Sequence, residues 1–168
     1  MGTSAARAAR VGGRVGNTVA RGASFGMGYT RCMRAGVAEI PFELPLGIPM
    51  MGYGARTGVA QGEHDPLHAR ALLLESGGCV LLVQLEVCLL GVSQAADLRE
   101  RIARRTGIAP DAIWITATHT HSGPETGLAA VLSGQPAPAW MEPVFAAAEE
   151  AAARALAGAE PARIGTGV

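Results

Sequence analysis

The sequence predicts an α/β fold: a partial mixed or parallel sheet with crossover helices, incomplete at the C-terminus. Two apolar runs, 67–74 and 79–90, flank the turn 76–78 of sequence Ser-Gly-Gly, which is the pattern of a β-hairpin. A helical pattern over 94–106 and a short β-rich run over 113–118 come next. Strand, helix and strand in this order predict a right-handed parallel crossover. The aromatic fraction of only 4% leaves Ala, Val and Leu to build the core, which suits helices on a buried sheet.

The crossover helix has clear limits in the sequence. Ser93 is a favoured N-cap residue, and Gly107 is placed as a C-cap. Between them, apolar side chains recur at the spacing of one helix face: Ala95, Leu98, Ile102 and Ala103. We therefore expect a helix over 94–106.

The remaining elements flank this unit. The stretch 34–54 holds Pro41, Pro45 and Pro49, which break any long helix and predict an edge strand followed by a loop. A loop rich in Gly and Pro is expected over 125–137. An alanine-rich helix then begins at Trp140 or Glu142 and ends at Ala157, with apolar residues on one side. The stretch 162–168 reads as a strand that is just beginning when the chain stops.

Residues 1–33 differ in composition from the rest of the chain. They are rich in Gly, Ala, Arg and Ser, hold five arginines and no acidic residue, and predict a disordered tail. Organellar transit peptides and basic arms share this composition, and a start codon assigned too far upstream explains it equally well. The segment has no apolar core of a secretory signal, so we expect a cytoplasmic protein, or a secreted one if the true start lies elsewhere.

Residues 34–168 are expected to form one domain, since a chain of 168 residues fits a single core. The net charge is zero and no basic face is indicated, which argues against a nucleic-acid partner. The longest strongly apolar run, 79–92, contains Gln84 and Glu86 and falls short of the ~20 residues of a membrane-spanning helix. Three cysteines without paired spacing predict free thiols rather than disulfides or a zinc ribbon.

Two histidines, His119 and His121, follow the predicted end of a parallel strand in the sequence Thr-His-Thr-His-Ser-Gly-Pro. Ligands of open α/β sheets bind beyond such strand ends. If the chain is extended here, both rings point to one face, about 6.6 Å apart at ~3.3 Å per residue. They could then approach one metal ion or supply a general base. Zinc needs three or four ligands, so the pair is at most half of a site. Solvated histidines beside a turn are the alternative.

Other polar residues have a structural and a functional interpretation. His64 and Asp65 could bind a metal or orient a base, but a loop pair before the next strand is the interpretation we favour. His68 and Arg70 alternate with apolar neighbours and predict a solvated strand face.

Cys88 lies near a strand end and could approach the histidine site, although a buried structural thiol is the commoner case. Glu149 and Glu150 predict the solvated surface of the last helix.

Four segments together resemble the neutral/alkaline non-lysosomal ceramidases, specifically the start of their catalytic domain. The resemblance covers about residues 34–168 and keeps the family's order. Its elements are Met51-Gly52-Tyr53-Gly54, His64-Asp65-Pro66-Leu67-His68-Ala69-Arg70-Ala71, the strand around Glu86, and Ala117-Thr118-His119-Thr120-His121-Ser122-Gly123-Pro124. The last element is specific to the family, and the other three support it.

This resemblance implies a zinc-dependent amidohydrolase that cleaves the N-acyl bond of ceramide to sphingosine and a fatty acid. It makes His119 a zinc ligand and places His121 beside the metal as a catalytic residue that orients a ligand or the substrate by a hydrogen bond. Zinc would polarise the amide carbonyl. The family's other ligands, a histidine, a glutamate and a tyrosine, and its nucleophilic serine all lie beyond Val168. Ser122 is therefore expected to be a turn residue, and Glu86 stands where the family often has aspartate.

Taken together, the residues predict a fragment of a ceramidase-like zinc hydrolase that acts on a lipid amide and is inactive by itself. Its partner would be the remainder of the catalytic domain. Two alternatives stay open. One is a zinc hydrolase for a different amide or ester. The other is a non-catalytic remnant or interaction domain whose unfinished sheet edge pairs with another chain.

Overall fold

The computed structural model describes residues 33–127, 132–134 and 136–165. The predicted tail lies outside the described residues except for Met33, with which the first strand begins. Cys32 and the end of the predicted last strand, 166–168, also lie outside them.

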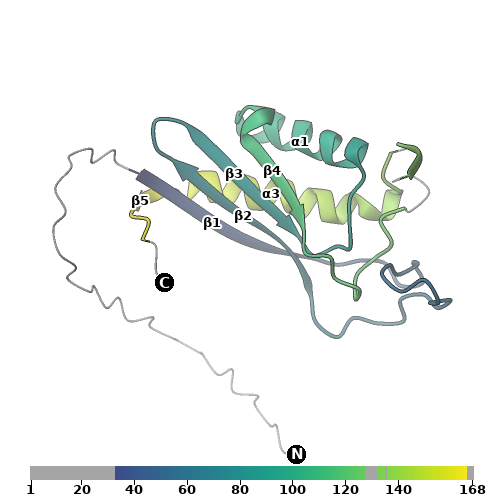
Figure 1. Cartoon of the computed structure of the whole chain (residues 1–168). Helices are drawn as coiled ribbons and strands as arrows, with labels where there is room; N and C mark the ends of the chain where they lie inside the picture. Colours follow the sequence, from purple (N-terminus) through teal and green to yellow (C-terminus); the bar gives the residue numbers. More distant parts are fainter. Residues whose placement is uncertain (1–32, 128–131, 135, 166–168) are drawn as a thin grey trace, which may run out of the picture. The chain divides into compact units, whose positions relative to one another are not determined.

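Five strands form one mixed sheet (Figure 1). They are β1 (Met33–Phe42), β2 (Leu67–Glu75), β3 (Cys79–Leu85), β4 (Ile113–Ala117) and β5 (Glu160–Ala162), and their order in the sheet is β4-β3-β2-β1-β5. β2 and β3 form the predicted antiparallel hairpin, while β3 and β4 are parallel. The predicted α/β class with a mixed sheet is confirmed.

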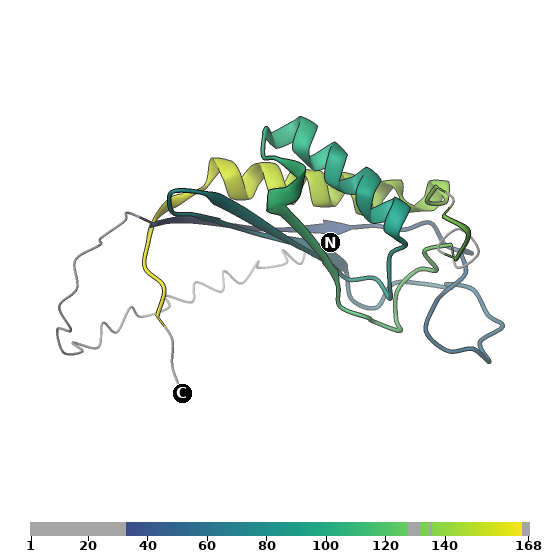
Figure 2. The same cartoon turned by 45° about the horizontal axis from the view of Figure 1, so that its top comes forward.

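Two long helices, α1 (Val92–Thr106) and α3 (Glu142–Ala157), lie on the same face of the sheet (Figure 2). Short 3₁₀ turns at Pro110–Ala112 and Ala139–Met141 precede β4 and α3. α1 connects β3 to β4 as the predicted crossover helix, and Gly107 caps it in the left-handed conformation (φ 74°). Among the described helices none is long and apolar enough to cross a membrane.

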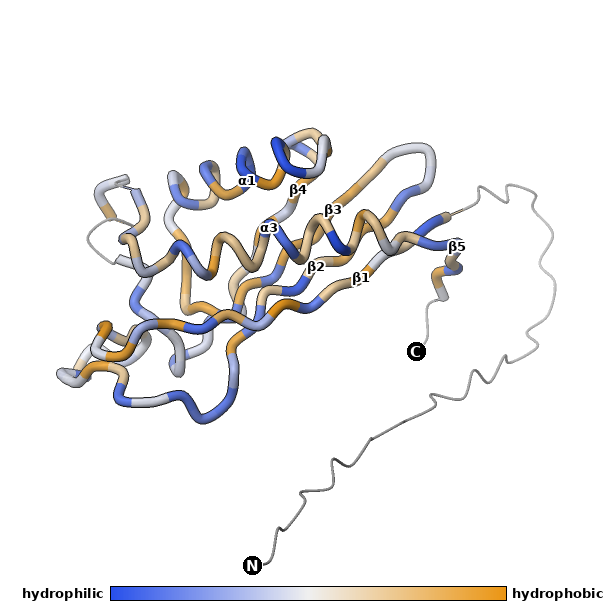
Figure 3. The backbone as a smooth tube through the Cα atoms, turned by 180° about the vertical axis from the view of Figure 1, so that it is seen from behind, coloured by the Kyte–Doolittle hydropathy of each residue, from blue (hydrophilic) through white to orange (hydrophobic). Residues whose placement is uncertain are grey.

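The core lies between the sheet and these helices, where aliphatic side chains of β2, β3 and α1 meet the alanines of α3. Small side chains on α3 allow the helix to approach the sheet closely. At Gly36 of β1, an added Cβ would lie 1.9 Å from the carbonyl oxygen of Ala155. Figure 3 shows hydrophobic residues along β2 and β3 behind α3, and hydrophilic residues recurring on α1. The opposite face of the sheet is more exposed, with Trp114 at 65% and Val37 at 74%.

Helix α1 and its N-cap both begin two residues earlier than predicted. The N-cap is Gly91 rather than Ser93, because the Gln94 side chain accepts a hydrogen bond from the Gly91 N–H at 3.0 Å. Gln94 is itself buried and donates to the carbonyl of Thr126 at 2.9 Å. This polar side chain therefore ties the start of α1 to the loop that follows the histidine segment, a role that its sequence position does not indicate.

Strands β1 and β5 also differ from the prediction. β1 pairs with β2 from Arg34 to Phe42, but β5 covers its other side at Met33–Ala35, so this part of β1 is not an edge. β5 is antiparallel to β1 and overlaps the predicted last strand, 162–168, only at Ala162. Residues 163–165 follow it without strand structure, so this part of the prediction is wrong.

Ion pairs join the two helices, so the prediction that Glu149 and Glu150 are simply solvated is wrong. Arg101 of α1 donates to Glu149 at 2.6 Å and to Glu142 at 2.8 Å, and the Glu149 side chain is only 16% exposed. Glu150 pairs with Arg105 and, at 2.7 Å, with Arg154. The acids of α3 face the arginines of α1 because the two helices lie side by side.

Candidate metal centre

The two parallel strands continue side by side beyond their formal ends. The Thr118 N–H donates to the carbonyl of Leu85 at 3.0 Å, and the His119 N–H donates to the carbonyl of Val87 at 3.1 Å. Parallel strands end at the same edge of a sheet, so the segments that leave β3 and β4 stay adjacent. This pairing places Cys88, three residues after β3, next to His119.

His119 adopts a left-handed backbone conformation with φ 61°. The extended geometry predicted for the His-x-His pair is therefore wrong, because the strand ends at Ala117 and the chain turns at His119. The two imidazoles still meet: the ring centroids of His119 and His121 lie 5.1 Å apart at an interplanar angle of 65°. A turn, rather than strand alternation, brings the rings together.

One nitrogen of His119 has a defined partner. Nδ1 lies 2.9 Å from the carbonyl oxygen of Cys88. A carbonyl only accepts hydrogen bonds, so Nδ1 must carry the proton and the neutral ring presents the lone pair of Nε2. Metal-binding histidines are commonly oriented by a hydrogen bond of this type. The residue is exposed, which leaves Nε2 accessible to an ion.

His121 is held by the loop that precedes β2. Its ring packs edge-on against Tyr53 with centroids 4.8 Å apart, and its carbonyl accepts a hydrogen bond from Arg56 at 3.0 Å. Arg56 also lies over the Tyr53 ring, 4.9 Å from the centroid. Gly52 lies directly against the imidazole, since a Cβ at this position would be 2.3 Å from Cγ of His121. The loop thus fixes the orientation of the second histidine.

Backbone pairing joins this loop to the residues after the histidines. Met50 and Pro124 form an isolated antiparallel bridge, and the Glu125 N–H donates to the carbonyl of Pro49 at 2.8 Å. The sequence does not indicate the contacts that Arg56 and Gly52 make with His121. The positive φ of 118° at Gly52 marks the close approach. Only the folded chain shows what that backbone touches.

Cys88, His119 and His121 together form a group with the donor types of a metal site. Their ligand atoms all lie within 4.8 Å of one another. Cys88 is buried, His121 is half-buried and His119 is exposed, so the group opens toward solvent on one side. One sulfur and two imidazole nitrogens are donors that zinc accepts. The residues present therefore fit a zinc ion. Cys88 and Cys79 are both free thiols, as predicted for the cysteines.

A second polar cluster surrounds Glu86 at the same end of the sheet. Its carboxylate accepts hydrogen bonds from the Arg70 guanidinium and, at 2.7 Å, from the backbone N–H of His68. Arg70 also donates to Glu39 of β1 at 2.5 Å. His68 and Arg70 alternate with buried neighbours and lie on the face of the sheet opposite the helices, as predicted. Acidic side chains engage both of them there, and their side chains are 20% and 37% exposed.

The environment of Glu86 keeps its carboxyl ionised. Burial would raise the pKa, but the hydrogen bond from Arg70 and the one from the His68 backbone outweigh burial and hold the pKa of Glu86 below its ordinary value. Glu86 thus anchors the segment between β3 and Cys88 to β2. This contact helps to fix the position of Cys88 beside His119.

Replacing this carboxylate gives a pH-dependent prediction. We expect Glu86→Gln to lower the free energy of unfolding at neutral pH by about 1 kcal/mol. This is less than the loss of a fully buried charged hydrogen bond would cost, because Arg70 is partly exposed and solvent screens its interaction with Glu86. A lowered folded-state pKa stabilises the protein above the unfolded-state pKa, and this contribution disappears as pH falls through the folded-state pKa. Urea unfolding from pH 7 to pH 3 should show the two proteins converge in the acid range. Glu43→Gln, at an exposed position, is the control; an equal loss at every pH contradicts the prediction.

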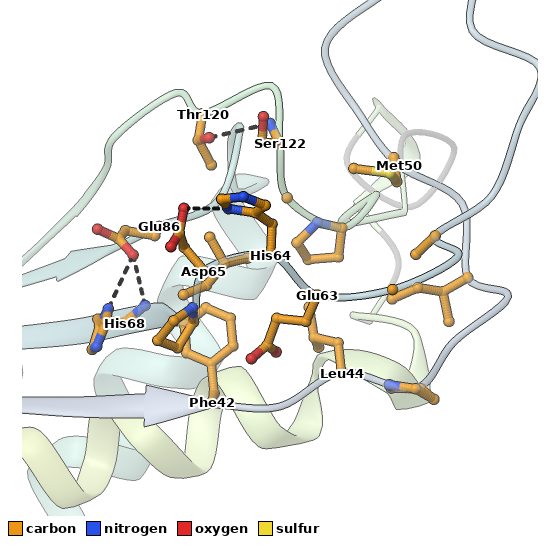
Figure 4. A pocket seen from close by; sticks show the side chains of 18 of the residues that line it. Phe42, Leu44, Met50, Glu63, His64, Asp65, His68, Glu86, Thr120 and Ser122 are labelled. Atoms are coloured by element: carbon orange, nitrogen blue, oxygen red, sulfur yellow. Dashed lines mark hydrogen bonds and ion pairs between the residues drawn. The ribbon is translucent and has the colours of Figure 1, made fainter.

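A cavity of about 710 Å³ lies next to the histidine segment, and Thr120 and Ser122 are among the residues that line it (Figure 4). Apolar side chains such as Phe42, Leu44 and Met50 line one part of it, and Glu86 and His68 lie at another. From the histidine segment it is lined by these residues: Thr118, Thr120, Ser122, Gly123 and Pro124. The intervening histidines turn instead toward Cys88 and Tyr53. The cavity and the metal-binding group are therefore separated by the backbone of this segment.

The remaining candidates take structural positions. His64 and Asp65 hydrogen-bond to each other at 2.8 Å, with side chains 97% and 86% exposed, as a loop pair just before β2 (Figure 4). They are not part of the metal-binding group. In the turn, the backbone N–H of Ser122 donates to the hydroxyl of Thr120 at 3.2 Å. Ser122 thus lies in the bend after His121, and the hydroxyl of Thr120 accepts the local hydrogen bond.

Comparison with solved structures finds the same arrangement of elements in part of two ceramidase chains. A crystal structure of neutral ceramidase from Pseudomonas aeruginosa superposes with a TM-score of 0.62 and 23% identity over 79% of this chain. A structure described as ceramidase complexed with C2 gives 0.61 and 23% identity over 77%. The chain spans 23% and 22% of those chains. Similarity at this level establishes a shared fold. No protein-family model and no curated protein sequence matches the chain.

Proposed function

We propose that the chain is the first part of a zinc-dependent, ceramidase-like amide hydrolase. The observation that carries the proposal is the placement of His119 and His121: both meet at the carboxyl ends of β3 and β4, in a fold shared with neutral ceramidase. Ligand sites of α/β sheets lie at this edge. The sequence resemblance and the shared fold therefore support the same two residues.

In this proposal the two histidines have different roles. His119 is the zinc ligand, because its Nδ1–H is directed at the carbonyl of Cys88 and its Nε2 is free to bind. His121 lies beside the metal, and its ring, held by Tyr53, is oriented to hydrogen-bond to the substrate or to another ligand. A bound zinc ion would supply Lewis-acid polarisation of the amide carbonyl.

Catalysis is proposed for a polypeptide that extends beyond these 168 residues. The chain corresponds to about a quarter of the ceramidase chains that it resembles in fold. We therefore expect the isolated chain to leave an N-acyl sphingoid substrate intact. The lipid amide is proposed as the substrate because the structural neighbours are ceramidases.

The test begins with the coding sequence that follows the codon for Val168. A continuation that supplies a histidine, a glutamate and a tyrosine as further ligands is expected, and the extended protein is then assayed with an N-acyl sphingoid amide, a short acyl amide and an acyl ester. Hydrolysis of the sphingoid amide should disappear on chelation and return with zinc. Cleavage of the other substrates alone would favour a different amidase or esterase. An immediate stop codon with no such sequence nearby would favour a non-catalytic remnant or interaction domain.

A further inference from the structure

The face of the sheet that the helices leave open carries apolar side chains on four neighbouring strands. Val37 of β1 pairs with Leu72 of β2. Leu72 pairs in turn with Leu82 of β3, and Leu82 pairs with Trp114 of β4. Paired residues lie on the same face of a sheet, so these four side chains form one row across it. Val37 and Trp114, at the two ends of the row, are 74% and 65% exposed.

A second apolar row lies beside the first. Leu74 of β2 pairs with Ala35 of β1 and with Val80 of β3, and Val80 is 45% exposed. A groove of about 660 Å³ lies along the first row, where Val37, Leu72 and Leu82 are among the residues that line it. The larger side chains of the two rows are called the open-face patch: Val37, Leu72, Leu74, Val80, Leu82 and Trp114.

The strands at the centre of the sheet are apolar on both faces. On the face under the helices, Leu73 of β2 and both Leu81 and Val83 of β3 are fully buried. The open-face patch is formed by the alternate residues of the same strands. Strands that are apolar on both sides are typical of sheets with both faces covered. Contiguous exposed apolar patches mark contact surfaces. The described residues thus form a sheet with the composition of an inner layer and with one side exposed.

Resting on the proposed function, we propose that the open-face patch is the docking surface for a further layer of the same hydrolase polypeptide, supplied by the part outside these 168 residues. The chain spans only 23% and 22% of the ceramidase chains that share its fold, so a protein of that size has enough polypeptide for another layer. Domains are built from two or three packed layers of secondary structure. Helices cover one face of the sheet (Figure 2), and the patch is where the next layer packs.

The polar end of the same face connects this docking surface to the candidate site. The next row beyond the patch contains Glu39, Arg70 and Gln84. Arg70 bonds to Glu39 and to Glu86, so a layer that covers this row leaves these charges paired. Glu86 lies at the strand ends that carry the histidines, where zinc needs three or four ligands. A layer of the same polypeptide on the patch therefore reaches the edge at which the proposed site requires further donors.

The experiment compares oxidation of Trp114 by hydroxyl radicals, read by mass spectrometry, in the 168-residue chain and in the extended protein encoded by the continuation after Val168. We expect oxidation of Trp114 to fall at least about fivefold in the extended protein, because side chains at the core of an interface become fully buried. Trp140 is the internal control. It is half-buried and donates to the carbonyl of Glu125 at 2.7 Å, so its oxidation should change little.

Trp114→Glu and Val92→Glu form a matched pair of variants. Both replace an exposed apolar side chain, 65% and 90% exposed, but Val92 lies at the start of α1, on the helix side of the sheet. In the 168-residue chain, each variant should keep the wild-type midpoint of thermal unfolding. In the extended protein, Trp114→Glu should lower this midpoint by at least about 4 °C, because it buries a charge without a partner. Val92→Glu should leave it unchanged.

The outcomes separate this inference from the proposed function. Equal oxidation of Trp114 in the two proteins contradicts the docking surface, and zinc-dependent hydrolysis by the same extended protein then leaves the proposed function standing. Protection of Trp114 without such hydrolysis supports the docking surface and contradicts the proposed function. A stop codon after Val168 with no further coding sequence nearby overturns both.

Two other occupants of the patch are tested in the 168-residue chain itself. Oxidation of Trp114 that rises when a dimer is diluted to monomer assigns the patch to a second copy of the chain. Oxidation that rises when residues 1–32 are removed assigns it to that segment. Either result overturns the inference.

Discussion

His119→Ala is expected to abolish metal binding by the chain. The imidazole is the most exposed donor of the group, and its free Nε2 is the atom directed away from the hydrogen bond to Cys88. Removing it leaves a buried sulfur and the half-buried His121, which are too few donors for the three or four ligands that zinc requires. Zinc affinity should fall at least about 100-fold, measured by competition with a chromophoric chelator.

The same substitution should have a larger effect on catalysis in the extended protein. Loss of Lewis-acid stabilisation of several kcal/mol corresponds to a decrease of about 1,000-fold in kcat/KM for an N-acyl sphingoid amide. His64→Ala is a suitable control for metal binding, because that histidine is 97% exposed and lies outside the metal-binding group. Unchanged zinc affinity in His119→Ala, or an equal loss in His64→Ala, would contradict the assignment.

Gly52→Ala is expected to destabilise the protein and to displace His121. Gly52 has φ 118°, which L-residues rarely adopt, and its Cβ would lie 2.3 Å from Cγ of the His121 ring. Backbone strain of this kind costs about 1–3 kcal/mol, and the overlap forces either the loop or the imidazole to move. We expect the free energy of unfolding to fall by that amount and the Co²⁺ spectrum of the metal-bound chain to change.

Gly54→Ala provides the matched control for this prediction. Gly54 lies two residues away in the same loop, and an added Cβ there would meet nothing within 4 Å. Its effect on stability should stay within about 0.5 kcal/mol. Urea unfolding and Co²⁺ titration of both variants give the comparison. If Gly52→Ala behaves like Gly54→Ala in both measurements, the loop does not hold His121 in the proposed way.

The β2–β3 hairpin and helix α1 could be predicted because each is encoded by residues that lie next to one another in the sequence. The Ser-Gly-Gly turn between two apolar runs indicated the β2–β3 hairpin, and the helical spacing that ends at Gly107 indicated α1. Capping was harder to predict. Ser93 has the chemistry of an N-cap, but the Gln94 side chain satisfies the Gly91 N–H and also reaches Thr126, a residue 32 positions away. Such a contact depends on the loop after the histidine segment and leaves no local pattern.

The sequence by itself determined the fold class and the place of the candidate site, because strand order and the rule for parallel sheets put His119 and His121 at a strand end. Only the tertiary structure decided how that site is built. The left-handed turn at His119 replaced the expected extended pair, Gly52 and Arg56 fixed His121, and pairing of the segments after β3 and β4 placed Cys88 beside His119. These contacts join segments that lie far apart along the chain. Their distances depend on backbone hydrogen bonds between segments, which no spacing along the chain specifies.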